Sequence, residues 1–115
     1  MHIEGYRFGR IRIDGVSYTK DVIILRGEVI SPWWREAGGH VFAPCDLSAV
    51  IEAAPDVVCL GTGAFSRVTV EPATLEALAR CGTEVIYDRT PRAVMGFNRL
   101  AGEGCDVAAA LHLTC

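Results

Sequence analysis

The chain has 115 residues, of which half are hydrophobic and 22% are charged, and its formal net charge is −3. This length and composition predict a single domain over residues 1–115 that buries a core, and they exclude a disordered chain. The eleven basic residues are scattered rather than gathered into a stripe, so we expect no nucleic-acid partner.

The N-terminus lacks the apolar segment of a secretory signal, and no apolar run reaches the roughly 18 residues of a membrane helix. We therefore expect a cytoplasmic protein without membrane insertion. The five cysteines are an odd number, and no two have the spacing of a zinc knuckle or a redox pair. Reduced thiols are the favoured interpretation, with no metal ion and no other cofactor.

The first third of the chain is predicted to form strands. Ile11 and Ile13 alternate with arginines, and Asp14-Gly15 is a two-residue hairpin signal. Residues 22–25 are four consecutive apolar residues, which predicts a strand covered on both faces. From Glu28 to Pro44 prolines and glycines, among them Gly38 and Gly39, predict a long loop with a short strand at residues 40–42.

The next segment predicts a helix that begins at Asp46, whose side chain would cap it, and ends before Pro55. A continuous apolar strand follows at residues 56–60. A second helix at residues 71–82 is predicted to turn Leu75, Leu78 and Ala79 inward.

A strand at residues 83–87 precedes a third helix, for which Thr90 is the predicted cap. Ala93 and Phe97 share its apolar stripe, and Met95 faces outward. A last strand covers residues 105–113. This alternation of strands and helices after a hairpin predicts one layered α/β domain with a mixed central sheet.

The second half of the chain contains a series of motifs. They are Leu60-Gly61-Thr62-Gly63 after a buried strand, then Thr90, Ala93, Phe97, Asn98 and Leu100 along a helix, then Glu103-Gly104 and VAAALHL from Val107. With Trp33-Trp34 and Gly39-His40, they resemble the small domain-of-unknown-function family that includes the adipogenesis-associated protein and a mitochondrial respiratory complex I assembly factor.

The resemblance implies an α/β fold with a mixed central sheet, two main helices and an N-terminal β-hairpin extension, the Asp46 helix being the shortest. It carries over no catalytic residues, because none is established for the family in general. Cys105 stands where the family usually has arginine, and Gly96 where a hydroxyl residue is common. If that arginine binds an anion or a partner, this chain has lost or relocated the contact.

Gly61-Thr62-Gly63 raises the question of a phosphate-binding loop. A dinucleotide fingerprint needs a third glycine and a helix directly after it. Ser66 stands at the third position and the next helix begins only near Pro72, so we favour a strand-exit turn. Because ligands gather at the carboxyl ends of strands in open α/β sheets, these residues are still the best place for a small anion.

Asn98 lies about two turns beyond Thr90 in the third helix. It either bonds a neighbouring backbone or lines a pocket with Gly63. The candidate ligand pocket therefore consists of Gly61, Thr62, Gly63, Thr90 and Asn98.

His112 shares a strand face with Asp106, Ala108 and Ala110, and a buried, hydrogen-bonded histidine is the favoured interpretation. The alternative is a base that activates Cys59 or Cys45, and His40 with Cys45 is no stronger. No catalytic residue is assigned.

Pro32-Trp33-Trp34 predicts one tryptophan that anchors the segment and one that is partly exposed. With Arg35 and Met95 they form a candidate partner surface. The favoured function is a non-enzymatic interaction or assembly-factor-like module that binds a protein partner or a second copy. The alternative is a small-molecule or anion-binding domain, or an enzyme, with a pocket near the Gly-Thr-Gly loop.

Overall fold

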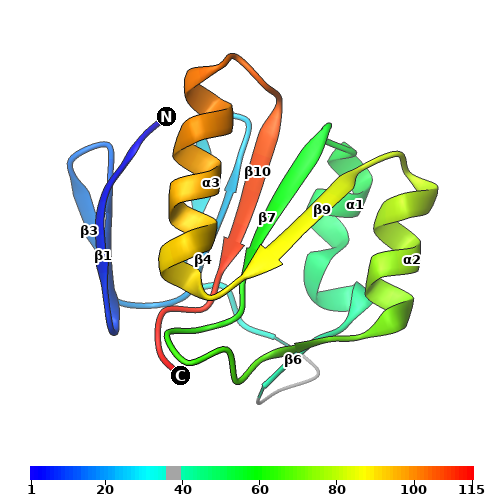
Figure 1. Cartoon of the computed structure of the whole chain (residues 1–115), viewed down its shortest axis with the longest axis horizontal. Helices are drawn as coiled ribbons and strands as arrows, with labels where there is room; N and C mark the ends of the chain where they lie inside the picture. Colours follow the sequence, from blue (N-terminus) through cyan, green and yellow to red (C-terminus); the bar gives the residue numbers. More distant parts are fainter. Residues whose placement is uncertain (36–39) are drawn as a thin grey trace.

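The computed structural model describes residues 1–35 and 40–115. At its centre is a five-stranded sheet of order β5-β4-β10-β7-β9 (Figure 1). β10 pairs parallel with β7 and antiparallel with β4, so the sheet is mixed, as predicted. The strands are β4 (Val22–Leu25), β5 (Glu28–Ile30), β7 (Val57–Gly61), β9 (Glu84–Asp88) and β10 (Val107–Leu111).

Helices cover both faces of this sheet (Figure 1). α3 (Thr90–Gly102) packs on one face, where Phe97 joins a buried cluster with Ile24 and Cys59. α1 (Ser48–Ala53) and α2 (Pro72–Arg80) lie on the other, where Leu78 joins a second cluster with Leu60. The central strands are therefore buried on both faces. Of the α-helices in the described residues, α1 is the shortest, as predicted. In the described part of the chain, no helix is long and apolar enough to cross a membrane.

The N-terminal extension is an antiparallel sheet of three strands: β1 (Ile3–Arg7), β2 (Arg10–Ile13) and β3 (Val16–Tyr18). Asp14 and Gly15 both have positive φ, which confirms the predicted hairpin turn between β2 and β3. β1 was not predicted, because Gly5 interrupts its alternation and the register with β2 shifts there.

The segment from Glu28 to Pro44, predicted as a long loop with one short strand, contains two strands among its described residues. It opens with the edge strand β5, which pairs with β4 through a tight turn at Arg26 and Gly27, both with positive φ. The predicted short strand is present as β6 (Val41–Phe42), which pairs parallel with β8 (Thr69–Val70). Gly38 and Gly39 lie outside the described residues.

The predicted cap at Asp46 is wrong. Pro44 begins a 3-10 turn, η1 (Pro44–Leu47), so Asp46 is already its third residue. The Asp46 carboxylate reaches back to accept a hydrogen bond from the Ala43 N–H at 2.9 Å. Leu47 then occupies the cap position of α1.

α2 has a different inward face from the one predicted. Leu78 is buried, but Ala79 is exposed and Thr74 is buried in its place. The Thr74 hydroxyl donates to the Phe42 carbonyl at 2.7 Å, which ties α2 to β6. A hydroxyl with a backbone acceptor can thus occupy the buried stripe of a helix, which hydrophobic periodicity does not detect.

Thr90 joins three segments: the exit of β7, the start of α3 and the end of β10. It is the first residue of α3, and Arg89 is the cap residue, so the predicted cap is wrong. The Thr90 hydroxyl accepts a hydrogen bond from the Gly63 N–H at 2.9 Å and donates one to the His112 carbonyl at 2.6 Å. The side chain is fully buried.

Gly61 and Gly63 are required by this close packing. A Cβ on Gly61 would lie 2.9 Å from Thr90 Oγ1, and one on Gly63 would lie 2.7 Å from the Cys115 carbonyl oxygen. Gly63 also has a φ of +104°, which disfavours any other residue. These contacts confirm the strand-exit turn.

Replacing Thr90 by valine keeps the shape of the side chain but leaves the Gly63 N–H and the His112 carbonyl without their buried partner. We expect Thr90→Val to lower the free energy of unfolding by about 2–4 kcal/mol, measured by urea denaturation. Thr90→Ser keeps the hydroxyl and should lose only about 1 kcal/mol for the missing methyl group. Equal losses in the two variants would contradict the bridging role of the hydroxyl.

Candidate functional site

Of the predicted pocket residues, the structure brings four together and separates the fifth. Gly61, Gly63 and Thr90 bond and pack against one another, and Thr62 lies beside them at the end of β7. The Asn98 amide instead pairs with the backbone of Ile3, accepting from its N–H at 2.9 Å and donating to its carbonyl at 2.8 Å. The backbone-bonding alternative for Asn98 is therefore confirmed.

A helix N-terminus does adjoin the Gly-Thr-Gly turn, but it belongs to α3 and not to the helix that follows in sequence. Its amides already have partners. The Thr90 N–H donates to the Gly63 carbonyl at 3.1 Å, and those of Arg92 and Ala93 donate to the Arg89 carbonyl. Pro91 has no N–H. This end of α3 therefore leaves no amide of its first turn for a bound anion.

Cys59 is poorly suited to act as a nucleophile with His112. It lies buried beneath α3, and burial, only partly offset by the charge of Arg99, raises the pKa of its thiol to about 11. The thiol therefore stays protonated at neutral pH and is a poor nucleophile. Cys45 is exposed. Across the described residues, no three His, Cys, Asp or Glu side chains gather in a way that could hold a metal ion.

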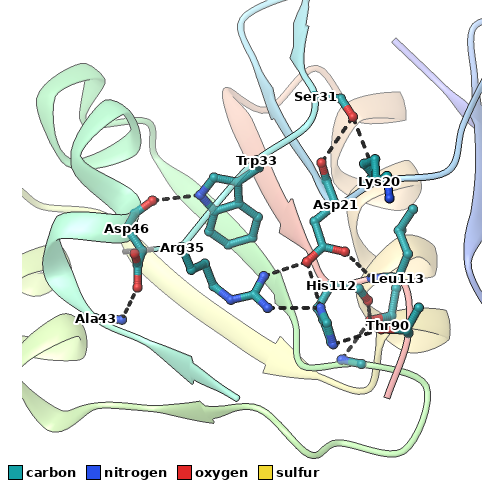
Figure 2. A network of polar contacts seen from close by, with 12 residues as sticks. Lys20, Asp21, Ser31, Trp33, Arg35, Ala43, Asp46, Thr90, His112 and Leu113 are labelled. Carbon is teal, nitrogen blue, oxygen red and sulfur yellow. Dashed lines mark hydrogen bonds and ion pairs between the residues drawn. The ribbon is translucent and has the colours of Figure 1, made fainter. Parts of the chain in front are cut away.

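His112 belongs instead to a charged network, centred on Asp21, that the sequence did not reveal (Figure 2). Oδ2 of Asp21 accepts from Arg35 Nη1 at 2.5 Å and from His112 Nδ1 at 2.7 Å. Its Oδ1 accepts from the Leu113 N–H at 2.9 Å. His112 is 7% exposed, so the prediction of a buried, hydrogen-bonded histidine is confirmed.

This Asp21 network is assembled by the sheet. Asp21 directly precedes β4 and His112 directly follows β10, and these strands pair antiparallel with Leu111 opposite Val22. Residues 91 positions apart in sequence are thereby brought into contact. Only the strand order, which the sequence pattern does not specify, could have located the pair.

The network holds Asp21 in its ionised form and determines which ring nitrogen of His112 donates to it. Burial alone would raise the pKa of Asp21, but hydrogen bonds from His112, Arg35 and the Leu113 amide outweigh it and hold that pKa below its usual value. Because the ionised carboxylate only accepts, Nδ1 of His112 carries the proton of their hydrogen bond. Its Nε2 lies 3.3 Å from Thr114 Oγ1.

The two tryptophans divide their roles as predicted. Trp33 is 6% exposed, and its indole N–H donates to the Asp46 carbonyl at 2.9 Å, while Trp34 is 72% exposed. The guanidinium of Arg35 lies 5.4 Å from the centre of the Trp33 ring. Trp33 and Arg35 therefore belong to the interior, and of the predicted partner surface only Trp34 and Met95 are exposed.

Beside the network is an open cavity of about 330 Å³, which we call the Trp34 cavity. Lys20, Asp21, Trp34, His112 and Thr114 contribute to its lining. It lies at the carboxyl end of β10, the end of a parallel strand at which α/β proteins bind ligands.

Cys105 stands where the family usually has arginine, and another arginine lies close to this position in the structure. Arg26, in the turn between β4 and β5, forms an ion pair with Asp106 at 3.1 Å and lines the same small cavity as Cys105. A guanidinium is thus present next to this position, although it comes from another part of the chain.

The depressed pKa of Asp21 gives a pH prediction. Ionised Asp21 stabilises the fold above the carboxyl's unfolded pKa of about 3.9, and this stabilisation is lost as the pH falls through the lower folded value. Asp21→Asn should therefore cost about 3–5 kcal/mol of unfolding free energy at pH 7, because the buried ion pair between Asp21 and Arg35 is broken. The difference from the wild type should shrink at acid pH.

Urea denaturation between neutral and acid pH measures this difference. Asp56→Asn makes the same chemical change at an exposed aspartate and is the control, with little loss at any pH. Parallel curves for Asp21→Asn and the wild type would contradict the proposed role of the carboxylate charge.

Comparison with solved structures shows the same fold in several other proteins. The conserved hypothetical protein PH1505 from Pyrococcus horikoshii OT3 is 27% identical, with a TM-score of 0.86 and full coverage of both chains. A protein from Bordetella parapertussis is also 27% identical, with a TM-score of 0.80, over 97% of this chain and 94% of that one. A protein from Bordetella pertussis, described as an Mth938-like domain, is 22% identical with a TM-score of 0.68, over 97% and 85% of the two chains.

A family model described as a protein of unknown function, DUF498/DUF598, matches residues 3–112. This match spans nearly the whole chain and agrees with the resemblance seen in the motifs. The chain belongs to the DUF498/DUF598 family.

Proposed function

We propose that the chain is a protein-interaction module that docks through aromatic side chains at the carboxyl end of its parallel strands. One observation carries the proposal. All four exposed aromatic residues of the described chain, each 55% to 72% exposed, lie at this end of the molecule. We call this surface the aromatic end; it consists of Phe8, Trp34, Phe65 and Tyr87.

Backbone hydrogen bonds to the end of the chain hold two of these residues together. The Gly9 N–H, next to Phe8, donates to the Leu113 carbonyl at 2.8 Å, and the Ala64 N–H, next to Phe65, donates to the Thr114 carbonyl at 2.8 Å. The Phe8 and Phe65 rings consequently lie 6.0 Å apart. Trp34 lies near the same segment, because it lines one cavity together with Thr114.

Such a surface is typical of interaction sites. Aromatic rings bury much apolar area on binding and lose little conformational freedom, and they are frequent among the residues that dominate binding energy. A cluster of exposed rings on a monomer is also unusual, because water contact with apolar surface is unfavourable. The resemblance to a family that includes an assembly factor also favours a role in protein interaction.

Replacing Phe8 and Phe65 by serine should remove the docking surface without disturbing the core. In affinity capture, the wild-type chain should retain a partner, or a second copy, that Phe8→Ser/Phe65→Ser retains about tenfold less or worse. Val16→Ser, an exposed apolar residue in β3, is the matched control and should behave as the wild type. Sedimentation equilibrium separates self-association from binding of another protein.

A photo-crosslinking amino acid at position 65 gives an independent measurement. It should form one adduct of defined mass, and the same group at position 16 should not. Adducts at both positions, or capture that is unchanged in Phe8→Ser/Phe65→Ser, would contradict docking through the aromatic end.

A second cavity favours a second candidate function, the binding of a small polar molecule. Its volume is about 350 Å³, and its lining includes Thr62, Ser66, Thr69, Tyr87 and Asp88. The segments that follow β7 and β9 lead to helices on opposite faces of the sheet, which is the switch point where α/β folds bind ligands. The Asp88 carboxylate and the hydroxyls suit an uncharged ligand with several hydroxyl groups better than an anion.

A thermal-shift screen of uncharged sugars and polyols tests this candidate. A true ligand at about 100 times its Kd should stabilise the wild type by about 2.7 kcal/mol. The stabilisation should fall in Ser66→Ala and persist in Ser17→Ala, a serine of the N-terminal sheet. This candidate function would be contradicted if no compound raised the melting temperature of the wild type, or if Ser66→Ala kept the full thermal shift.

A further inference from the structure

The Trp34 cavity has a floor that is fixed before any ligand arrives. The side chains of Asp21, Arg35 and His112 are only 16%, 10% and 9% exposed. Oδ2 of Asp21 holds Arg35 and His112, and Oδ1 holds the backbone of Leu113. Groups held in this way do not need to be ordered on binding, so a ligand meets a lower entropic cost.

Among the described residues that line the cavity, Lys20, Asp21 and Arg35 carry charge, and they leave one cation in excess. The charges of Asp21 and Arg35 cancel within their ion pair. Lys20 adds an ammonium group to the lining, and within residues 1–35 and 40–115 no carboxylate forms an ion pair with it. An uncompensated ammonium beside a low-dielectric wall attracts an anionic group.

Another wall of the cavity is flat and apolar. Trp34 offers a large exposed indole, and the buried Trp33 before it fixes the backbone from which that indole projects. An aromatic ring in this position can stack on a planar molecule. His112 Nε2 and the Thr114 hydroxyl, which also belong to the lining, add hydrogen-bonding groups.

We propose that the Trp34 cavity is a binding site for a small planar carboxylate, whose ring lies on Trp34 and whose carboxylate pairs with Lys20. The volume of about 330 Å³ suits a compound of one or two rings. This inference goes beyond the proposed function. It shares Trp34 with the aromatic end, but it adds Lys20 and a ligand of another class, and Phe8→Ser/Phe65→Ser leaves both of its residues in place.

Lys20 is the only lysine in the sequence, which allows a direct test. Reductive methylation with ¹³C-formaldehyde keeps its charge and labels one side chain and the N-terminal amine. The whole chain is then titrated with 2-naphthoate and followed by NMR. We expect a saturable shift of the Lys20 methyl signal and of the Trp34 indole N–H, with a Kd of about 1 mM or tighter.

Neutral 2-naphthamide separates the charge from the ring. It should bind about fivefold more weakly than 2-naphthoate, and Lys20→Met, followed on the Trp34 indole signal, should abolish that difference. Trp34→Leu, followed on the Lys20 signal, should weaken 2-naphthoate by about fivefold or more. Arg92→Met removes an exposed cation from α3 and should leave both affinities unchanged.

Three results would overturn the proposal. They are the absence of a saturable shift, a shift at Lys20 without one at Trp34, and equal affinity for the two compounds. Because Lys20 and Trp34 are exposed, their replacement should leave the fold intact. The dispersion of the backbone amide spectrum verifies this for each variant.

Discussion

The buried hydroxyl of Thr90 is the contact on which the arrangement of this protein depends. It satisfies a donor at the exit of β7 and an acceptor at the end of β10, and it does so from the first residue of α3. Two strands and a helix are thereby held at fixed distances at the carboxyl end of the sheet. The glycines at positions 61 and 63 permit this closeness, because a side chain at either would overlap the neighbouring segments. The role of the Gly-Thr-Gly turn is thus to allow these segments to pack closely.

The same packing sets the position of the Asp21 network. The carbonyl of His112 is fixed by Thr90, and its imidazole is fixed by Asp21. Buried ion pairs add little net stability compared with apolar packing, since both charges lose their water. Their presence here is better explained by what they position: a histidine whose Nδ1 is held by Asp21, and a guanidinium stacked on Trp33, at the floor of an open cavity.

The fold could be predicted further than the site could. Apolar runs and turn residues are local signals, and they located the central strands, the helices and the hairpin at Asp14-Gly15. Two of the errors concern polar side chains whose hydrogen bonds are not those of the predicted helix caps. Thr90 and Asp46 both resemble helix caps in the sequence. Thr90 instead connects separate segments of the chain, and Asp46 is the third residue of η1 rather than the residue before it. β5 was missed because its turn, Arg26-Gly27, uses an arginine with positive φ.

The candidate site required knowledge of the strand order. Nothing in the sequence around Asp21 marks it as a partner of His112, because their contact follows from the pairing of β4 with β10. That one of Trp33 and Trp34 is buried and the other exposed was predictable, since adjacent side chains of an extended segment point in different directions. Which of the two would be buried was not, because that depends on the Asp46 carbonyl, which lies 13 residues away.

The amide of Asn98 pairs with both polar groups of Ile3, much as a neighbouring strand would. At the other end of β1, the Tyr6 hydroxyl donates to the Leu113 carbonyl at 2.7 Å. With the hydrogen bond from Gly9 to Leu113, these contacts fasten both ends of β1 to the core, and any movement of the N-terminal sheet relative to the core would have to break them. A partner that reaches Phe8 and Phe65 together thus meets a preformed surface, so little of the free energy of association is spent on aligning its two halves.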